Sequence, residues 1–221
     1  MKNFTFKLAL IMIIGFIGIQ KPISAQSSIT IDASQVYSNF RFLDSLGVRD
    51  HSYSGAYSGA YSLGYRHIYA KGLLLSANIG MRKAGATMVV DNSNYEWSLQ
   101  YMNLKVGAGY IYRLTKLGIY ATISPYVSYL LKANQRINNE NFDIKKTNSI
   151  QNLDMGGVGT LGTQLAVSDY ITVYGEVNYL MGLYNIEGSS RGNTFVWQKA
   201  NGQQTYNRAL SATLGVSFSI K

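Results

Sequence analysis

Apolar and polar side chains alternate along most of the chain. The pattern is clearest over residues 152–186, where two long alternating segments are separated by only a few residues. In the second segment, apolar side chains at odd positions from Ile171 to Leu183 oppose polar ones at Thr172, Glu176 and Asn178. A period of two residues is typical of a β-strand with one apolar and one polar face, so this stretch predicts a β-hairpin.

The turn of this hairpin follows from the parity of its two arms. Side chains opposite one another on antiparallel strands point to the same face, so Val167 and Ile171 must share the apolar face. The connection then has an odd length, most simply residues 168–170. The resulting register places Glu176 opposite Gly162 and Tyr174 opposite Gln164.

The same alternation predicts six further strands, for a total of eight. The first of them loses phase where Val36 and Phe40 follow the regular part, and the one that contains Trp97 changes parity, which predicts a β-bulge near residues 101–103. Pro125 predicts a second bulge or one lost hydrogen bond, because proline cannot donate to the ladder. The expected strands lie near residues 28–42, 53–69, 73–82, 95–112, 117–131, 156–167, 171–183 and 210–220.

Long and short connections alternate strictly between these strands. Long polar loops are expected near residues 47, 90, 140 and 195, and short turns near residues 71, 115 and 169. Parity predicts a three-residue turn at 70–72 and a four-residue turn at 113–116. The latter turn would place Gly109 opposite Tyr120.

Met1 to Ala25 have the three-part layout of a secretory signal peptide: basic residues, a short apolar core and a polar end. The apolar core is too short to span a bilayer, so cleavage after Ala25 is expected rather than an uncleaved anchor. The remaining residues, 26–221, are expected to form a single domain.

Composition leaves two protein classes open, soluble proteins and β-barrel membrane proteins. The chain is 47% hydrophobic and 14% charged, and it has no cysteine, which excludes disulfides, thiol catalysis and cysteine zinc sites. Without Lys2, Lys7 and Lys21 of the signal peptide, 17 basic residues face 11 acidic ones, a net charge of +6. These charges form no Lys/Arg cluster of the kind that binds nucleic acid, so no nucleic-acid partner is expected.

The polarity of the two faces predicts an all-β fold, an eight-stranded antiparallel up-and-down transmembrane β-barrel. A closed barrel with a lipid-facing exterior satisfies every backbone group without an exposed edge. The alternative, a soluble lipocalin-like or avidin-like barrel, would carry its polar residues outside. Aromatic residues at the strand ends fit two interfacial girdles: Tyr95, Trp97, Tyr129 and Tyr179 near the long loops, and Tyr110, Tyr112 and Phe218 near the short turns.

With this pattern the whole mature chain resembles the small porin-like outer-membrane β-barrel proteins of the OmpA/OmpX type. The last strand also resembles the assembly signal of such barrels, with matches at Thr213, Gly215 and Phe218, while the aliphatic Ile220 departs from it. The resemblance implies a location in the bacterial outer membrane. It also implies outer-membrane lipid and the barrel-assembly machinery as partners.

Five charged residues fall on the inward parity: Arg66, Arg82, Lys105, Asp154 and Glu176. Because buried charges are costly unless paired, we expect an ion cluster, with Glu176 as the partner of Lys105 or Arg66. An eight-stranded barrel has an interior about wide enough for side chains alone. The cluster is therefore interpreted as structural filling rather than a selectivity filter.

No catalytic residue, metal or cofactor is expected. His51 lies beside Asp50 and Ser52, as in outer-membrane hydrolases, but a polar loop residue is the simpler interpretation. Asp44 with Asp50, or Asp91 with Asn92 and Asn94, could bind calcium loosely, although neither set has a known metal-binding spacing.

The leading functional hypothesis is a non-enzymatic outer-membrane barrel. Its long loops would face outward for surface contact or envelope integrity, with a partner that the sequence does not identify. The alternatives are a narrow porin-like channel for small solutes and an outer-membrane lipid-modifying enzyme at His51.

Overall fold

The computed structural model describes residues 26–188, 195–196 and 202–220, so the predicted signal peptide, 1–25, lies outside the described residues. All the regular structure in the described part is β-strand. No helix in that part is long and apolar enough to cross a membrane. The strands are β1 (Gln26–Leu43), β2 (Arg49–Asp50), β3 (Ser54–Ile68), β4 (Leu73–Val90), β5 (Ser93–Leu114), β6 (Leu117–Ile137), β7 (Glu140–Asp143), β8 (Leu153–Ala166), β9 (Ile171–Gly182) and β10 (Gln204–Ile220).

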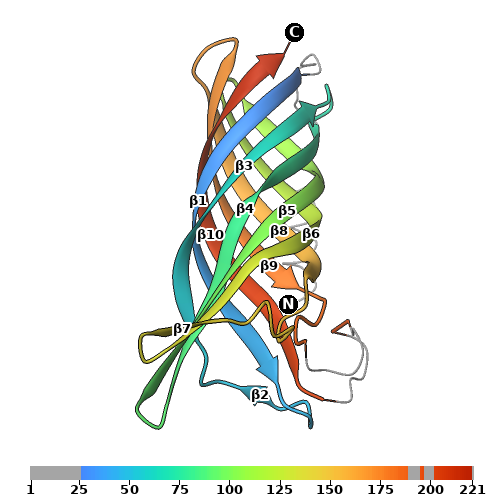
Figure 1. The fold of residues 1–221 in the computed structure, drawn as a ribbon. Coiled ribbons are helices and arrows are strands. Elements are labelled where there is room, and N and C mark those ends of the chain that lie inside the picture. Colours follow the sequence, from blue (N-terminus) through green and yellow to red (C-terminus); the bar gives the residue numbers. More distant parts are fainter. Residues whose placement is uncertain (1–25, 189–194, 197–201, 221) are drawn as a thin grey trace, which may run out of the picture.

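Eight long strands close into a ring (Figure 1). Each pairs antiparallel with the next long strand in the chain, and β10 pairs with β1 from Ser27 opposite Ile220 to Leu43 opposite Gln204. The end of the barrel that carries the long loops is here called the outer end, and the end with the three short turns the inner end. The short strands β2 and β7 pair with β1 and β6 at the outer end. The predicted eight-stranded up-and-down barrel is therefore confirmed.

The predicted inside and outside of β8, β9 and β10 are confirmed. On β9, Val173, Val177 and Tyr179 are exposed, whereas Thr172 and Asn178 are buried in the lumen. The hairpin register is also as predicted, with Glu176 opposite Gly162 and Tyr174 opposite Gln164. The barrel consequently has an apolar exterior over its central zone, as a lipid-facing wall requires.

Of the three short turns, one departs from the prediction. The turns at 70–72 and 168–170 have the expected length, because Ile68 pairs with Leu74 and Ala166 with Thr172. The turn at 113–116 is shorter by two residues, since Leu114 pairs directly with Leu117. The first residue of this turn, Thr115, has a positive φ of 53°, and this backbone conformation permits the tight two-residue connection. The predicted facing of Gly109 and Tyr120 is thus wrong: Gly109 lies opposite Thr122.

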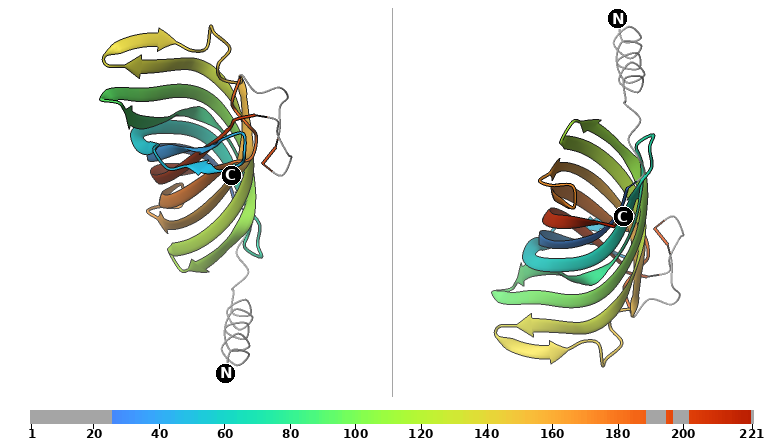
Figure 2. Two further views of the ribbon diagram at one scale, coloured as in Figure 1. Left: turned by 90° about the horizontal axis from the view of Figure 1, so that it is seen from below. Right: turned by 90° about the horizontal axis from the view of Figure 1, so that it is seen from above.

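The predicted long loops near residues 90 and 140 are largely β-hairpins. Strands β4 and β5 run on to a two-residue turn at Asp91 and Asn92, and β6 continues through Asn138 and Asn139 into β7. These four turn residues all have positive φ, as the tight turns of hairpins require. The outer ends of β4 to β7 consequently project as a sheet to one side beyond the barrel (Figures 1 and 2).

The predicted loss of phase in β1 and change of parity in β5 are wrong. Both strands keep one alternation throughout, but at the outer end of the barrel apolar side chains also fill the interior, among them Val36, Phe40 and Leu99. The bulge lies on the neighbouring strand instead. The pairing between β5 and β6 shifts between Gln100 and Tyr101, which leaves Leu131 of β6 without a partner on β5.

Pro125 lies on the exposed face of β6. The β5–β6 ladder is interrupted from the Lys105–Tyr126 pair to the Ala108–Ile123 pair, and the register is the same on both sides. Of the two predicted consequences, a local loss of pairing is therefore observed and a bulge is not.

The predicted aromatic girdles are confirmed in part. Tyr129 and Tyr179 are exposed near the outer ends of their strands, and Tyr110 and Phe218 near the short turns. Trp97, however, shares the inward parity of β5 and packs on the buried cluster at the outer end, with Tyr95 stacked against it.

Candidate functional site

The inner half of the lumen is crossed by an ion pair between two distant strands. Arg66 of β3 donates from Nη2 to Oε1 of Glu176 on β9 at 2.9 Å, and the Tyr120 hydroxyl donates to the same oxygen at 2.7 Å. The guanidinium also lies 4.8 Å and 4.6 Å from the ring centroids of Tyr120 and Tyr174. Such cation–π contacts offset part of the cost of burying Arg66.

Asp32 of β1 extends this network and was not among the predicted residues. Its carboxylate accepts hydrogen bonds from Ser62 Oγ at 2.8 Å and from the Tyr174 hydroxyl at 3.1 Å. The sequence contained a signal for it, because Asp32 shares the polar parity of Thr30 and Ser34.

A second network lies nearer the loop end and centres on Asp154 of β8, which is completely buried. Arg82 of β4 donates from Nη2 to Oδ2 of Asp154 at 2.9 Å. The Tyr126 hydroxyl and Asn207 Nδ2 donate to the same carboxylate at 3.1 Å and 2.8 Å. The Arg82 guanidinium lies 5.0 Å from the ring centroid of Tyr101. A buried carboxylate with three donors is a rigid cross-brace between strands on several sides of the barrel.

The five predicted charges are thus brought together as two ion pairs and one separate lysine. Glu176 takes Arg66 as its partner, and Lys105 has no carboxylate within 4 Å in the described part of the chain. Lys105, Asp32 and Glu176 instead line a cavity of about 70 Å³ between the two networks, which has room for a few water molecules.

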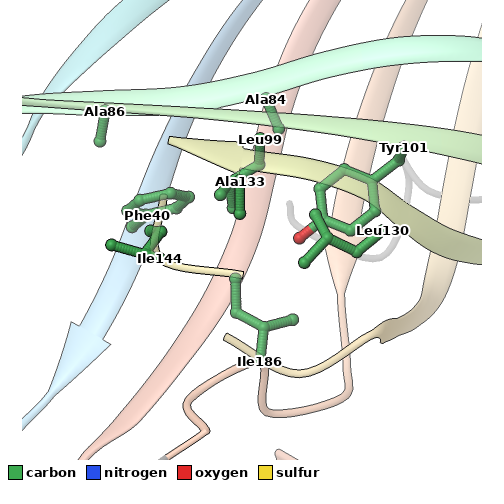
Figure 3. Packing of buried hydrophobic residues seen from close by; sticks show 9 residues of the cluster. All are labelled: Phe40, Ala84, Ala86, Leu99, Tyr101, Leu130, Ala133, Ile144 and Ile186. Atoms are coloured by element: carbon green, nitrogen blue, oxygen red, sulfur yellow. The ribbon is translucent and has the colours of Figure 1, made fainter. Parts of the chain in front are cut away.

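The outer end of the lumen is filled by a cluster of apolar side chains, here called the outer plug (Figure 3). Trp97 of β5 and the loop residues Tyr53 and Ile150 pack against it. Sequence reasoning missed the plug because it placed Leu99 on the apolar outer face of its strand and assigned the segments with Ala84, Ala86, Ala133 and Ile144 to polar loops. The plug consists of Phe40, Ala84, Ala86, Leu99, Tyr101, Leu130, Ala133, Ile144 and Ile186.

The candidate hydrolase residues lie in an exposed turn at the loop end. Asp50 Oδ1 accepts the backbone N–H of Ser52 at 2.8 Å, and this hydrogen bond lowers the pKa of the Asp50 carboxyl below its usual value. The carboxylate is therefore engaged with its own backbone. The other histidine, His67, contacts Ser27 Oγ through Nδ1 at 2.9 Å, at the opposite end of the barrel.

The loosely predicted calcium residues also serve local turns. Asp44 Oδ1 accepts the backbone N–H groups of Leu46 and Val48, and Asp91 and Asn92 form the β4–β5 turn. Within residues 26–188, 195–196 and 202–220, no three His, Asp or Glu side chains gather as they would around a metal ion.

The residues that match the assembly signal have distinct structural positions. Thr213 Oγ1 faces the lumen, 2.7 Å from Ser34 Oγ, and Phe218 faces outward. Gly215 is packed under Tyr174, and a Cβ at this position would lie 2.3 Å from the Tyr174 ring. Gly215 thus has a packing role of its own, and recognition of this strand by the assembly machinery stays a prediction.

Comparison with known proteins shows the fold. No protein-family model and no curated protein matches the sequence. Among solved structures, the outer membrane protein AlkL in DMPC lipid bilayers matches with a TM-score of 0.53 and 10% identity, over 92% of this chain and 93% of AlkL. Ail of Yersinia pestis matches with a TM-score of 0.47 and 11% identity, over 90% of this chain and 100% of Ail. The neisserial surface protein NspA matches with a TM-score of 0.47 and 13% identity, over 88% of this chain and 99% of NspA.

The match to AlkL extends over nearly the full length of both chains, and the exterior of the barrel has the polarity that a bilayer requires. The chain therefore has the fold of the small outer-membrane β-barrel proteins, an eight-stranded transmembrane β-barrel.

Proposed function

We propose that this protein is a non-conducting, non-enzymatic barrel of the bacterial outer membrane that presents its long outer hairpins and loops for contact at the cell surface or for envelope integrity. The outer plug is the observation that carries the proposal. Its residues come from four strands of the wall and from two loop segments, and none is more than 8% exposed. A pore that is filled in this way at its mouth offers no continuous water path.

The two ion networks support the same function. They cross the lumen below the plug and hold four of the inward charges in two ion pairs, Arg66 with Glu176 and Arg82 with Asp154. Charges that line a selectivity filter must remain free to meet passing ions. Paired charges instead hold opposite walls together.

The projecting hairpins supply the contact surface. The outer ends of β4, β5, β6 and β7 form a continuous sheet beyond the barrel, which rigid backbone pairing holds in place (Figure 1). A rigid platform loses less conformational entropy on binding than a flexible loop does. This favours recognition of a partner outside the cell.

Conductance measurement tests the proposal. Purified barrel inserted in a planar bilayer is expected to give no reproducible current steps, because the plug and the networks close the lumen. A Phe40→Ala/Leu99→Ala variant, which thins the plug, serves as a positive comparison. Steps of constant size from the wild type would establish the narrow channel, the second candidate, which the cavity lined by Asp32, Lys105 and Glu176 favours.

The proposal includes that the protein has no enzymatic activity. This part is supported by the local geometry: Asp50 Oδ1 accepts the backbone N–H of Ser52, and in the described part of the chain no hydrogen bond joins Asp50 to the exposed His51. Lipid A and phospholipids from cells that express the wild type and a His51→Ala variant should be identical. A modification that only the wild type makes would assign an enzyme to this loop.

A further inference from the structure

The outward face of β4, β5 and β6 changes from apolar to basic in a single step. Strand pairing places Met81, Met102 and Tyr129 side by side in one row across the three strands. Below it, toward the short turns, lies the row of Ile79, Leu104 and Val127. All but Met81 of these six side chains are more than 40% exposed on the outside of the wall, as lipid-facing residues should be.

The next row outward consists of Lys83, Gln100 and Lys132. Lys83 pairs with Gln100, and Gln100 pairs with Lys132, so the three side chains share the outer face. Because neighbouring strands are about 5 Å apart, the two lysine Cα atoms lie roughly 10 Å from each other. Both lysines are exposed, and their long side chains can converge on one ligand.

A third ammonium group lies at the same level. Lys145 Nζ donates to the carbonyl oxygens of Leu130 and Leu131 at 2.9 Å and 3.0 Å, and it lies 5.6 Å from the Tyr129 ring centroid. Leu131 is the residue of β6 that the register shift leaves without a partner on β5. Two of the three ammonium protons of Lys145 are engaged in these hydrogen bonds. The charge of Lys145 thus lies beside the row of Lys83, Gln100 and Lys132.

The acidic residues nearby are already engaged. Asp143, one row further out opposite Asn134, forms an ion pair with Lys146 at 3.6 Å. Glu96 is bound to Arg136 two rows further out than the lysines. In the described part of the chain, neither Lys83 nor Lys132 has a carboxylate within 4 Å.

We propose that Lys83, Lys132 and Lys145 bind the phosphate groups of an anionic glycolipid in the outer leaflet, with its acyl chains along the two apolar rows below. The inference rests on the proposed function in one respect, that the barrel spans the outer membrane with its hairpins outside. Lysines at the edge of the hydrocarbon place their charge at the level of lipid headgroups. The exposed apolar rows beneath them fit a lipid rather than free phosphate.

Lipid binding in solution tests the proposal. The full barrel, folded in dodecyl maltoside micelles, is titrated with bisphosphorylated lipid A, and bound lipid is counted by native mass spectrometry. The Lys83→Gln/Lys132→Gln variant is expected to bind about tenfold more weakly, and the wild-type affinity should fall with added salt. Lys145 is left in place, because its ammonium also holds two backbone carbonyls.

The matched control is Lys71→Gln/Lys116→Gln, which removes the same charge from two exposed short turns at the opposite end. Equal loss in both variants, no loss in the first, equal affinity for dephosphorylated lipid A, or equal affinity for inorganic phosphate would each overturn the proposal. The orientation of the barrel is measured separately, by protease cleavage of the β4–β5 hairpin on whole cells. The protease assay and the conductance measurement thus test the proposed function, whereas the micelle titration tests lipid binding alone.

Discussion

The Val177→Arg variant is expected to lose most of its folded, membrane-inserted barrel. Val177 lies in the middle of β9, is 55% exposed and faces outward between Leu161 of β8 and Ala212 of β10. Arginine there would place a charge in hydrocarbon near the midplane of the bilayer, at a cost of about 2 to 4 kcal/mol. The folded fraction can be read from the heat-modifiable band in detergent gels, and the free energy of unfolding from urea titration in vesicles.

Val167→Arg is the matched control for this variant. Val167 faces the same side and is 60% exposed, but it lies at the short turn, where the cost of a charge falls to about 0 to 1 kcal/mol. A depth-dependent difference between the two variants is the expected result. If both are harmless, the exterior of the barrel does not face lipid.

The Asp154→Ala variant is expected to insert but to lose about 3 to 5 kcal/mol of its free energy of unfolding. Removal of this carboxylate leaves the Arg82 charge buried without compensation. It also removes the acceptor of the Tyr126 hydroxyl and of Asn207. Urea titration of the refolded barrel measures the loss, and surface labelling of the hairpins shows that insertion persists.

Asp143→Ala is a control for the loss of a carboxylate in general. Its partner, Lys146, is 85% exposed, and such surface pairs contribute only about 0 to 1 kcal/mol. An Arg82→Met/Asp154→Leu double variant should recover much of the stability, because the uncompensated charge is then gone. Similar losses for Asp143→Ala and Asp154→Ala would show that the inner network does not brace the barrel.

The barrel itself was predictable because its central zone obeys one rule. Where the wall faces lipid and the lumen is polar, apolar side chains mark the outside, so alternation alone determined strand number, polarity and most of the register. The interior charges on that parity could be identified for the same reason. Asp32 followed the same rule and could have been included with them.

The outer end was not predictable in this way, because there both faces of the strands are apolar or mixed. Phe40, Leu99 and Ala86 turn inward to fill the mouth of the barrel, and alternation has no means of distinguishing them from lipid-facing residues. Alternation also could not decide which cation pairs with Glu176, because it places both Arg66 and Lys105 on the inward face. The positions of the strands in the barrel determine that Arg66 is the partner.

The projecting hairpins did have a local signal. Asp91-Asn92 and Asn138-Asn139 each lie between segments with β-forming residues, and such pairs readily adopt the positive φ of a two-residue turn. Their polar surroundings suggested loops. In the structure these segments project beyond the barrel, where strands no longer need an apolar face toward lipid.

Spin-label accessibility along β9 tests the assigned faces of the barrel most directly. The chain has no cysteine, so single Cys substitutions from Val173 to Leu180, each carrying a nitroxide, report one position at a time in lipid vesicles. The predicted result is a period of two residues, with Val173, Val177 and Tyr179 open to oxygen dissolved in the bilayer, and Tyr174, Asn178 and Leu180 shielded from it. Labels at the odd positions that are accessible instead to a water-soluble nickel complex would contradict the transmembrane barrel.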